Sequence, residues 1–255
     1  MTDSSTKPAL TLDAVQLDYD NSFTALRNLS ATFAAGSFTA LVGPSGCGKS
    51  SLLRLMAGLL TPQHGHYTPP PQSDIGFVFQ EPTLLAWKSV YDNIALPLKI
   101  AGLPPAGRAA RVEEALALVG LASRADALPR ELSGGMKMRV SLARALAKRP
   151  PILLMDEPFA ALDELTRFKL DDELRAIWQQ QKCTIVFVTH SVTEAAYLAE
   201  RALVMRDGSI EAAIDIDQNN RADAFRAAPA FHAACAAISN ALGHDAATSK
   251  AGGRP

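Results

Sequence analysis

The stretch Leu41-Val42-Gly43-Pro44-Ser45-Gly46-Cys47-Gly48-Lys49-Ser50-Ser51 matches the pattern G-x-x-x-x-G-K-[ST] at each fixed position. A short apolar run precedes it, and apolar residues recur at helical spacing after it. Between a strand and a helix, the glycines let backbone N–H groups face a phosphate chain. A glycine-rich turn without a ligand would explain the glycines but not Lys49 and Ser50. The stretch predicts a nucleoside triphosphate site, in which Lys49 reaches the β- and γ-phosphates and Ser50 ligates Mg²⁺.

The composition narrows the class of protein. The chain has 255 residues, a hydrophobic content of 48% and a formal net charge of −1, so it can bury a large core and has no basic field for nucleic acid. Its three cysteines are widely spaced, which suggests neither disulfides nor a zinc site and fits a reducing cytoplasm. No signal peptide is recognisable, and no stretch approaches the roughly 20 apolar residues that span a bilayer. We expect any contact with a membrane to be made from outside the lipid.

The order of the expected elements indicates an α/β fold. Strands are expected at 10–19, with a bulge, and at 26–33, 38–42, 75–79, 152–155, 184–188 and 202–205. Helices are expected after the phosphate-binding stretch, at about 112–119, after Ser133, and at about 164–180 and 193–199. Between about 82 and 148 the strand pattern disappears. Strands that alternate with helices predict a mostly parallel sheet.

The apolar run at 152–155 ends in Asp156, Glu157 and Pro158. A buried strand that carries a carboxylate at its C-terminal end is typical of the metal ligand in a parallel-sheet nucleotide site. We assign Asp156 to Mg²⁺, directly or through water, and Glu157 to polarising the attacking water. Asp-Glu-Pro is also ordinary turn chemistry. The phosphate-binding stretch upstream favours the functional interpretation.

A second anion site is predicted at Leu132-Ser133-Gly134-Gly135-Met136. Ser133 is a good N-cap, and the two glycines leave the first N–H groups of the following helix uncovered. A single nucleotide hardly needs two such sites in one chain. The pair therefore suggests that two chains share nucleotides.

With these motifs in this order, residues 10–215 resemble the ATP-binding subunit of an ATP-binding cassette (ABC) transporter. The resemblance implies an α/β fold with a P-loop NTPase core and a mostly parallel sheet, an N-terminal antiparallel β subdomain and an inserted α-helical subdomain. It implies a dimer of two copies, in which Ser133 and Gly135 contact the γ-phosphate held by the other copy. The loop with Asp163 then crosses the dimer seam.

The resemblance also gives roles to three residues outside the main motifs. Gln80 matches a glutamine that senses Mg²⁺ and links to a membrane partner, His190 a histidine that contacts the γ-phosphate, and Tyr19 an aromatic that stacks on adenine. Taken alone, Gln80 could belong to a plain turn, His190 could be a structural histidine, and Tyr19 could be edge packing. Their order and spacing favour the functional interpretation.

The expected site residues form three groups. Glu157 and His190 are expected to act in catalysis, and Ser50, Gln80 and Asp156 to hold Mg²⁺. The residues expected to bind ATP are Tyr19, Gly43, Pro44, Ser45, Gly46, Cys47, Gly48, Lys49, Ser50, Ser51, Gln80, Ser133, Gly134, Gly135 and Asp163. Residues 1–8 are expected to be disordered, 9–220 to form the ATP-binding domain with its helical subdomain at about 82–148, and 221–255 to form a helix near 222–237 with a flexible tail.

The chain resembles the nitrate/sulfonate/taurine import subgroup of this family. The resemblance rests on a short cassette, in which we expect no appended C-terminal regulatory domain, and on the stretches Phe79-Gln80-Glu81-Pro82, Leu85-Ala86-Trp87 and 158–163. This implies an importer of a small anionic or vitamin-precursor-like solute, with multi-span permease subunits and, indirectly, a solute-binding protein. The subunit would lie on the cytoplasmic face of the inner membrane. The alternatives are a soluble ABC ATPase, or the ATPase of an exporter or lipid-handling system. One signature set, no long heptad run and a near-neutral charge speak against the soluble class.

Two local hypotheses concern Cys47 and Trp87. Cys47 lies near Lys49 at a helix N-terminus, which favours a reactive thiolate, although it could equally be an inert small residue that fills the loop. Trp87 is a large aromatic followed by Lys88 and Ser89, which is typical of an interface anchor. We expect a groove here for a short cytoplasmic helix of a permease, with Gln80 linking it to the γ-phosphate site.

Overall fold

A computed structural model describes residues 8–19, 23–160, 162–217 and 225–243. The expected disorder at 1–7 and the expected tail beyond 243 lie outside these residues. Pro8 already belongs to the first strand, β1 (Pro8–Tyr19). Among the described residues, no helix is both long and apolar enough to cross a bilayer.

The main sheet has six strands in the order β5-β6-β7-β3-β8-β9. Their bounds are Ile75–Val78 (β5), Ile152–Asp156 (β6), Thr184–Val188 (β7), Phe38–Val42 (β3), Arg201–Arg206 (β8) and Ser209–Asp215 (β9). Neighbouring strands are parallel except for β8 and β9, which form an antiparallel hairpin at the edge. The three central strands β3, β6 and β7 are buried along their whole length, which explains their continuous apolar sequences. The prediction of a mostly parallel sheet is therefore confirmed.

The second sheet is antiparallel and has the order β2-β1-β4, with β2 at Phe23–Ala34 and β4 at His64–Tyr67. The register between β1 and β2 shifts between Leu12 and Val15, where Ala14 has a φ of 49°. This irregularity is the bulge expected from the change of phase along the first strand. The short strand β4 is not among the strands expected from the sequence. It pairs with β1 at the edge of the sheet, where neither face needs an apolar pattern.

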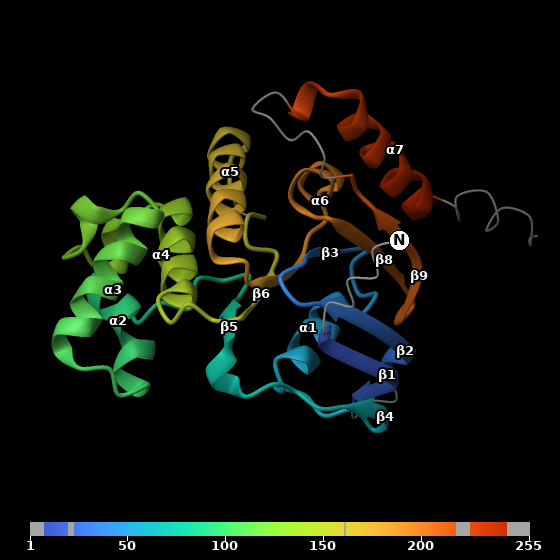
Figure 1. Cartoon of the computed structure of the whole chain (residues 1–255), viewed down its shortest axis with the longest axis horizontal. Coiled ribbons are helices and arrows are strands. Elements are labelled where there is room, and N and C mark those ends of the chain that lie inside the picture. Colours follow the sequence, from blue (N-terminus) through green and yellow to red (C-terminus); the bar gives the residue numbers. More distant parts are fainter. Residues whose placement is uncertain (1–7, 20–22, 161, 218–224, 244–255) are drawn as a thin grey trace, which may run out of the picture.

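The helices α1 (Lys49–Met56), α5 (Glu164–Gln181) and α6 (Val192–Leu198) lie close to the main sheet (Figure 1). Three others, α2 (Val90–Ile100), α3 (Pro105–Leu118) and α4 (Gly134–Leu146), form a separate helical group (Figure 1). Short 3₁₀ turns occur at Gln72–Asp74, Ala122–Arg124, Pro129–Glu131 and Phe225–Ala227. The inserted helical subdomain is thus present. Its first helix α2 continues through Pro97, a residue that usually ends a helix.

The C-terminal helix α7 (Pro229–Gly243) begins and ends later than the helix expected near 222–237. Proline at the first helical position lacks only an N–H that would be unpaired there, which explains the start at Pro229. Phe231, Ala234 and Ile238 are buried in the main core, and α7 packs against α6, β8 and β9. The helix is therefore part of the packed structure.

Two hydrophobic clusters lie on opposite faces of the main sheet. One joins the helical group, α5, α6 and α7 to the sheet, and the other fills the space between the sheet, α1 and the N-terminal sheet. The packing of both faces leaves the C-terminal ends of the parallel strands as the place where polar side chains can gather.

Candidate nucleotide site

The phosphate-binding loop connects β3 to α1 and is packed closely against its neighbours. Gly48, the N-cap of α1, has a φ of 100°, and a Cβ placed there would lie 2.3 Å from the carbonyl oxygen of Ala25 in β2. A side chain at this position would therefore meet both a strained backbone and a backbone atom. The glycine lets the loop lie against the N-terminal sheet while the first turn of α1 faces the loop.

Lys49 lies within this loop, with only 4% of its surface exposed. Its Nζ donates hydrogen bonds to the carbonyl oxygens of Gly43 and Pro44, both at 2.8 Å. A positive charge is thereby held inside a ring of backbone groups at the N-terminus of a helix. Such an arrangement favours a polyanion.

Ser50 and Asp156 meet between α1 and the end of β6. The Ser50 hydroxyl donates to Asp156 Oδ1 at 2.8 Å. Burial raises the pKa of the Asp156 carboxyl above its ordinary value, whereas the hydrogen bond from Ser50 opposes that change. A hydroxyl and a buried carboxylate are hard oxygen donors, and a cation between them would offset the cost of burying the charge. The two residues therefore fit Mg²⁺, which usually completes its shell with waters and phosphate oxygens.

Glu157 lies at the centre of the polar groups at the carboxyl edge of the sheet. Its Oε1 is 2.7 Å from His190 Nε2, and its Oε2 accepts a hydrogen bond from Gln80 Nε2 at 3.3 Å. Gln80 follows β5, Glu157 follows β6 and His190 follows β7, which are three adjacent strands. Glu157 has a φ of 47°, and its N–H donates to the carbonyl oxygen of Val188. Strained backbone of this kind clusters at functional sites.

Tyr19 ends β1 and lies beside the start of α1. Its hydroxyl is 3.2 Å from Ser51 Oγ, and 38% of the side chain is exposed. The structure thus brings Tyr19 to the phosphate-binding loop, although stacking on adenine stays a prediction.

Ser133 and Asp163 are both N-caps. Ser133 Oγ accepts from the N–H of Met136 at the start of α4, and Asp163 Oδ1 accepts from the N–H of Thr166 at the start of α5. The bond to Thr166 lowers the pKa of Asp163. A Cβ at Gly135 would lie 3.2 Å from Leu162 Cδ2, so the two caps belong to neighbouring segments. We call Leu162 and Asp163 the dimer loop; Ala161 lies outside the described residues.

The structure favours the second alternative for Cys47, an inert residue that fills the loop, over a reactive thiolate. The side chain is buried, and burial raises the pKa of its thiol even though Lys49 Nζ lies 3.8 Å from the sulfur. Cys183 is also buried, and burial raises the pKa of its thiol to about 11. Desolvation opposes the charged form more than the nearby lysine favours it. Cys47 instead fills the interior of the loop.

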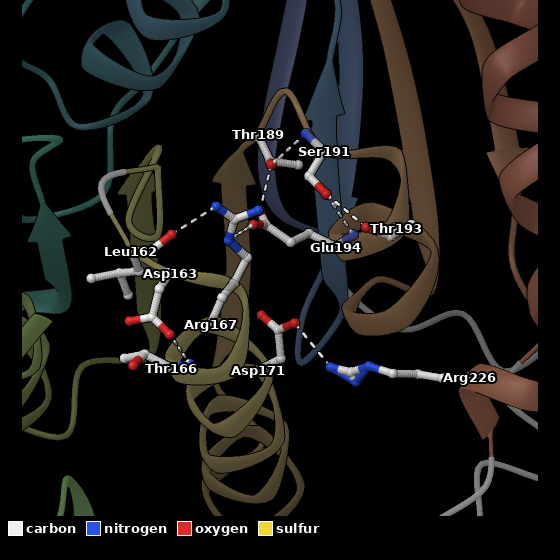
Figure 2. A network of polar contacts seen from close by, with 10 residues as sticks. All are labelled: Leu162, Asp163, Thr166, Arg167, Asp171, Thr189, Ser191, Thr193, Glu194 and Arg226. Carbon is white, nitrogen blue, oxygen red and sulfur yellow. Dashed lines mark hydrogen bonds and ion pairs between the residues drawn. The ribbon is translucent and has the colours of Figure 1, made fainter.

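The sequence interpretation missed a buried carboxylate at Glu194. Ser191 N-caps α6 and accepts from the N–H of Glu194, an arrangement typical of a capping box. In a capping box the glutamate turns back to the N-cap, but Glu194 instead accepts a hydrogen bond from Thr189 (Figure 2). The spacing from Ser191 to Glu194 was a readable signal of the cap, but not of this inward direction.

Comparisons with known proteins agree with this geometry. Residues 26–160 match a protein family described as ABC transporter. The chain is 44% identical over 227 residues to a taurine import ATP-binding protein, TauB, of Rhizobium johnstonii, with 84% of this chain and 87% of the relative covered. It is 45% identical over 227 residues to an aliphatic sulfonates import ATP-binding protein, SsuB, of Shigella sonnei, with 86% of each covered.

Among solved structures, the ATP-binding cassette MJ0796, described as a dimer in a post-hydrolysis state bound to ADP and Pi, is similar with a TM-score of 0.75 and 32% identity. The similarity covers 82% of this chain and 99% of that one. The predicted architecture of two sheets and an inserted helical subdomain is confirmed. The chain belongs to the ABC transporter family, as an ATP-binding and ATP-hydrolysing subunit related to the importers of taurine and aliphatic sulfonates.

Proposed function

We propose that this ATPase powers an importer for a small anionic solute of the sulfonate class. The observation that carries the proposal is the identity of 44% and 45% to subunits named for import of taurine and of aliphatic sulfonates, each over most of both chains. In this proposal the subunit lies on the cytoplasmic face of the inner membrane and binds multi-span permease subunits. A solute-binding protein delivers the solute from the other side.

Hydrolysis is proposed to depend on the carboxyl edge of the main sheet. Glu157 polarises the attacking water, because its carboxylate follows the proposed metal ligand Asp156 at the end of β6 and is held in place there by Gln80 and His190. His190 orients this carboxylate and contacts the γ-phosphate. Lys49 and the loop around it bind the phosphate chain. Mg²⁺ would be held by Ser50, Asp156 and Gln80 and would neutralise charge on the phosphate oxygens.

A second copy of the chain is proposed to complete each nucleotide site. Ser133, Gly134 and Gly135 begin α4 with uncovered N–H groups, and in Figure 1 this helix belongs to the helical group, whereas α1 lies beside the N-terminal sheet. Within one chain the two anion sites therefore lie on different parts of the molecule. The dimeric state described for MJ0796 supports an arrangement in which α4 and Asp163 of one copy face ATP held by the other.

The loop from Glu81 to Ser89 is proposed to contact the permease. Trp87 is 74% exposed, whereas Asn93 in α2 is fully buried and holds the loop from below. Asn93 Oδ1 accepts from the N–H of Leu85 at 2.8 Å, and its Nδ2 donates to the carbonyl oxygen of Ser89 at 2.9 Å. The loop thus presents a large aromatic side chain on a fixed backbone. An exposed aromatic on rigid backbone is typical of an interface anchor.

Arg144 connects this loop to α4. Its guanidinium donates to the carbonyl oxygens of Thr83 at 2.9 Å and Pro82 at 3.1 Å. A hollow of about 250 Å³ lies where α2 and α4 meet β5, and its lining includes Phe77, Leu96 and Arg144. ATP-driven movement of α4 would therefore carry the permease-binding loop with it.

The test is transport by the assembled complex. The subunit, its permease and its binding protein are reconstituted in proteoliposomes with MgATP inside, and uptake of taurine, an alkanesulfonate and a neutral amino acid is compared. We expect uptake of a sulfonate that requires both ATP and the binding protein. ATP-dependent export of solute from the proteoliposomes, or a subunit that never associates with a permease, would contradict the proposal.

A further inference from the structure

One arginine of α5 contacts both the dimer loop and α6 (Figure 2). The Nη2 group of Arg167 donates to the carbonyl oxygen of Leu162 at 3.0 Å, and its Nε lies 3.2 Å from Glu194 Oε1. Leu162 directly precedes Asp163, the residue expected to cross the dimer seam. The guanidinium of Arg167 therefore connects the dimer loop, which is expected to face the second copy, to the carboxylate of Glu194.

Glu194 continues this connection to the loop that carries His190. Its Oε2 accepts a hydrogen bond from the hydroxyl of Thr189, and the same hydroxyl oxygen accepts from the N–H of Ser191 at 2.9 Å. Thr189 and Ser191 are the two sequence neighbours of His190. Their contacts fix the backbone on both sides of the imidazole, which lies 2.7 Å from Glu157.

The connection tolerates few alternative arrangements because its centre is buried. Glu194 is 5% exposed, and burial raises the pKa of its carboxyl, while Arg167 and Thr189 oppose this change. A buried charge requires well-placed partners, and the planar guanidinium can bond two acceptors at once, which a lysine amine cannot do with the same geometry. Arg167, Thr189 and Glu194 also line a cavity of about 280 Å³ together with Glu157 and His190.

We propose that Arg167 is a positioning residue for ATP hydrolysis. Through Glu194 and Thr189, it fixes the position of the dimer loop relative to the loop that carries His190. When a second copy of the chain displaces the dimer loop, the guanidinium passes the displacement to the loop that orients Glu157. This inference rests on the roles proposed above for Glu157, His190 and the dimer loop.

The test measures steady-state ATP hydrolysis, binding of a fluorescent ATP analogue and thermal unfolding in variants of the full chain. For Arg167→Lys we expect kcat to fall about 10-fold, with KM and analogue binding within about twofold of wild type. Arg149→Lys is the matched control, because Arg149 pairs with exposed Glu114 at 2.6 Å outside this connection. Its kcat should equal that of the wild type.

Thr189 provides a second pair of variants. Thr189→Val removes the hydroxyl with little change of volume and should lower kcat about 10-fold, whereas Thr189→Ser keeps the hydroxyl and should retain kcat. Because both residues act through Glu194, the double variant with Arg167→Lys and Thr189→Val should lose no more than the worse single variant.

Any of three outcomes would overturn the proposal. The first is a kcat within about twofold of wild type for Arg167→Lys, and the second is equal kcat values for Thr189→Val and Thr189→Ser. The third is a kcat about 100-fold below wild type in the double variant, which is the result expected if the two residues act independently. If Arg167→Lys does not fold, the two Thr189 variants decide. Glu157→Gln is measured in parallel; normal hydrolysis by that variant would instead show that the proposed catalytic site is wrong.

Discussion

The carboxyl edge of the main sheet and the loop that carries Trp87 use buried polar groups in different ways. At the sheet edge the functional candidates contact one another, as Glu157 does with Gln80 and His190. In the loop, the buried Asn93 bonds only supporting backbone and leaves the Trp87 ring to solvent. A reacting centre needs fixed distances between its own side chains. A docking surface needs a rigid backbone under a side chain that a partner can cover.

The largest effect is expected from Glu157→Gln, which removes the proposed base from the sheet edge while keeping its size. Hydrolysis should fall by about 10²–10⁴-fold, the usual contribution of a positioned general base, whereas ATP binding should be retained. The variant should accumulate as an ATP-bound dimer, because hydrolysis is what separates the two copies. ATPase assays and size-exclusion chromatography with MgATP measure both results. A variant that stays monomeric with ATP and hydrolyses it normally would remove Glu157 from the site.

Asn93, which holds the loop that carries Trp87, should contribute to the stability of the folded subunit. Asn93→Ala leaves the backbone groups of Leu85 and Ser89 without their buried partner, so the free energy of unfolding should fall by about 2–4 kcal/mol. Urea unfolding of the isolated subunit measures this change. Asp92→Ala is the control, since Asp92 pairs with Lys88 and Lys99 in partly exposed ion pairs that contribute about 0–1 kcal/mol. Equal losses in the two variants would mean that Asn93 does not hold the loop.

Trp87→Ala should affect binding of the permease without affecting the isolated subunit. We expect ATPase activity of the isolated subunit within a few-fold of wild type and permease binding weakened by about 2 kcal/mol, which is roughly 30-fold. ATP-dependent uptake should be lost. Co-purification and uptake assays measure these effects, and Leu59→Ala, at another exposed apolar residue, should change neither. Uptake that survives Trp87→Ala with assembly intact would place the docking surface elsewhere.

The smallest effect is expected at Cys47, inside the phosphate-binding loop. Because burial raises the pKa of the Cys47 and Cys183 thiols, both should react slowly with maleimide at pH 7, and partly exposed Cys235 should react first. Labelling of Cys47 should become faster as the pH rises, since the thiolate is the reactive form. Mass spectrometry of timed samples measures the order. Fast labelling of Cys47 at neutral pH would support the reactive thiolate. It would also mean that burial does not suppress the reactivity of Cys47 as it does that of Cys183.

Local and periodic features of the chain could be predicted without coordinates. These features are the phosphate-binding stretch, the helix cap at Ser133 and the apolar strands β3, β6 and β7. Each depends on neighbours within a few residues or on one repeated pattern. The same holds for β5 and β8 and for the helices between the strands, which the alternating pattern predicted. Gln80, Glu157 and His190 could be placed at one edge because each follows a strand of the same parallel sheet.

Other features arise from contacts between distant parts of the chain. The edge strands β4 and β9 carry weak apolar patterns, because each has a partner on only one side. The burial of Cys47 depends on how the loop packs, and its thiol pKa follows from that burial and not from the neighbouring lysine. The bond from Arg167 to Leu162 is local to the start of α5, but Arg167 meets Glu194 only because α5 and α6 lie side by side. Charge, hydrogen bonding and desolvation at such positions depend on three-dimensional neighbours, which a single sequence does not reveal.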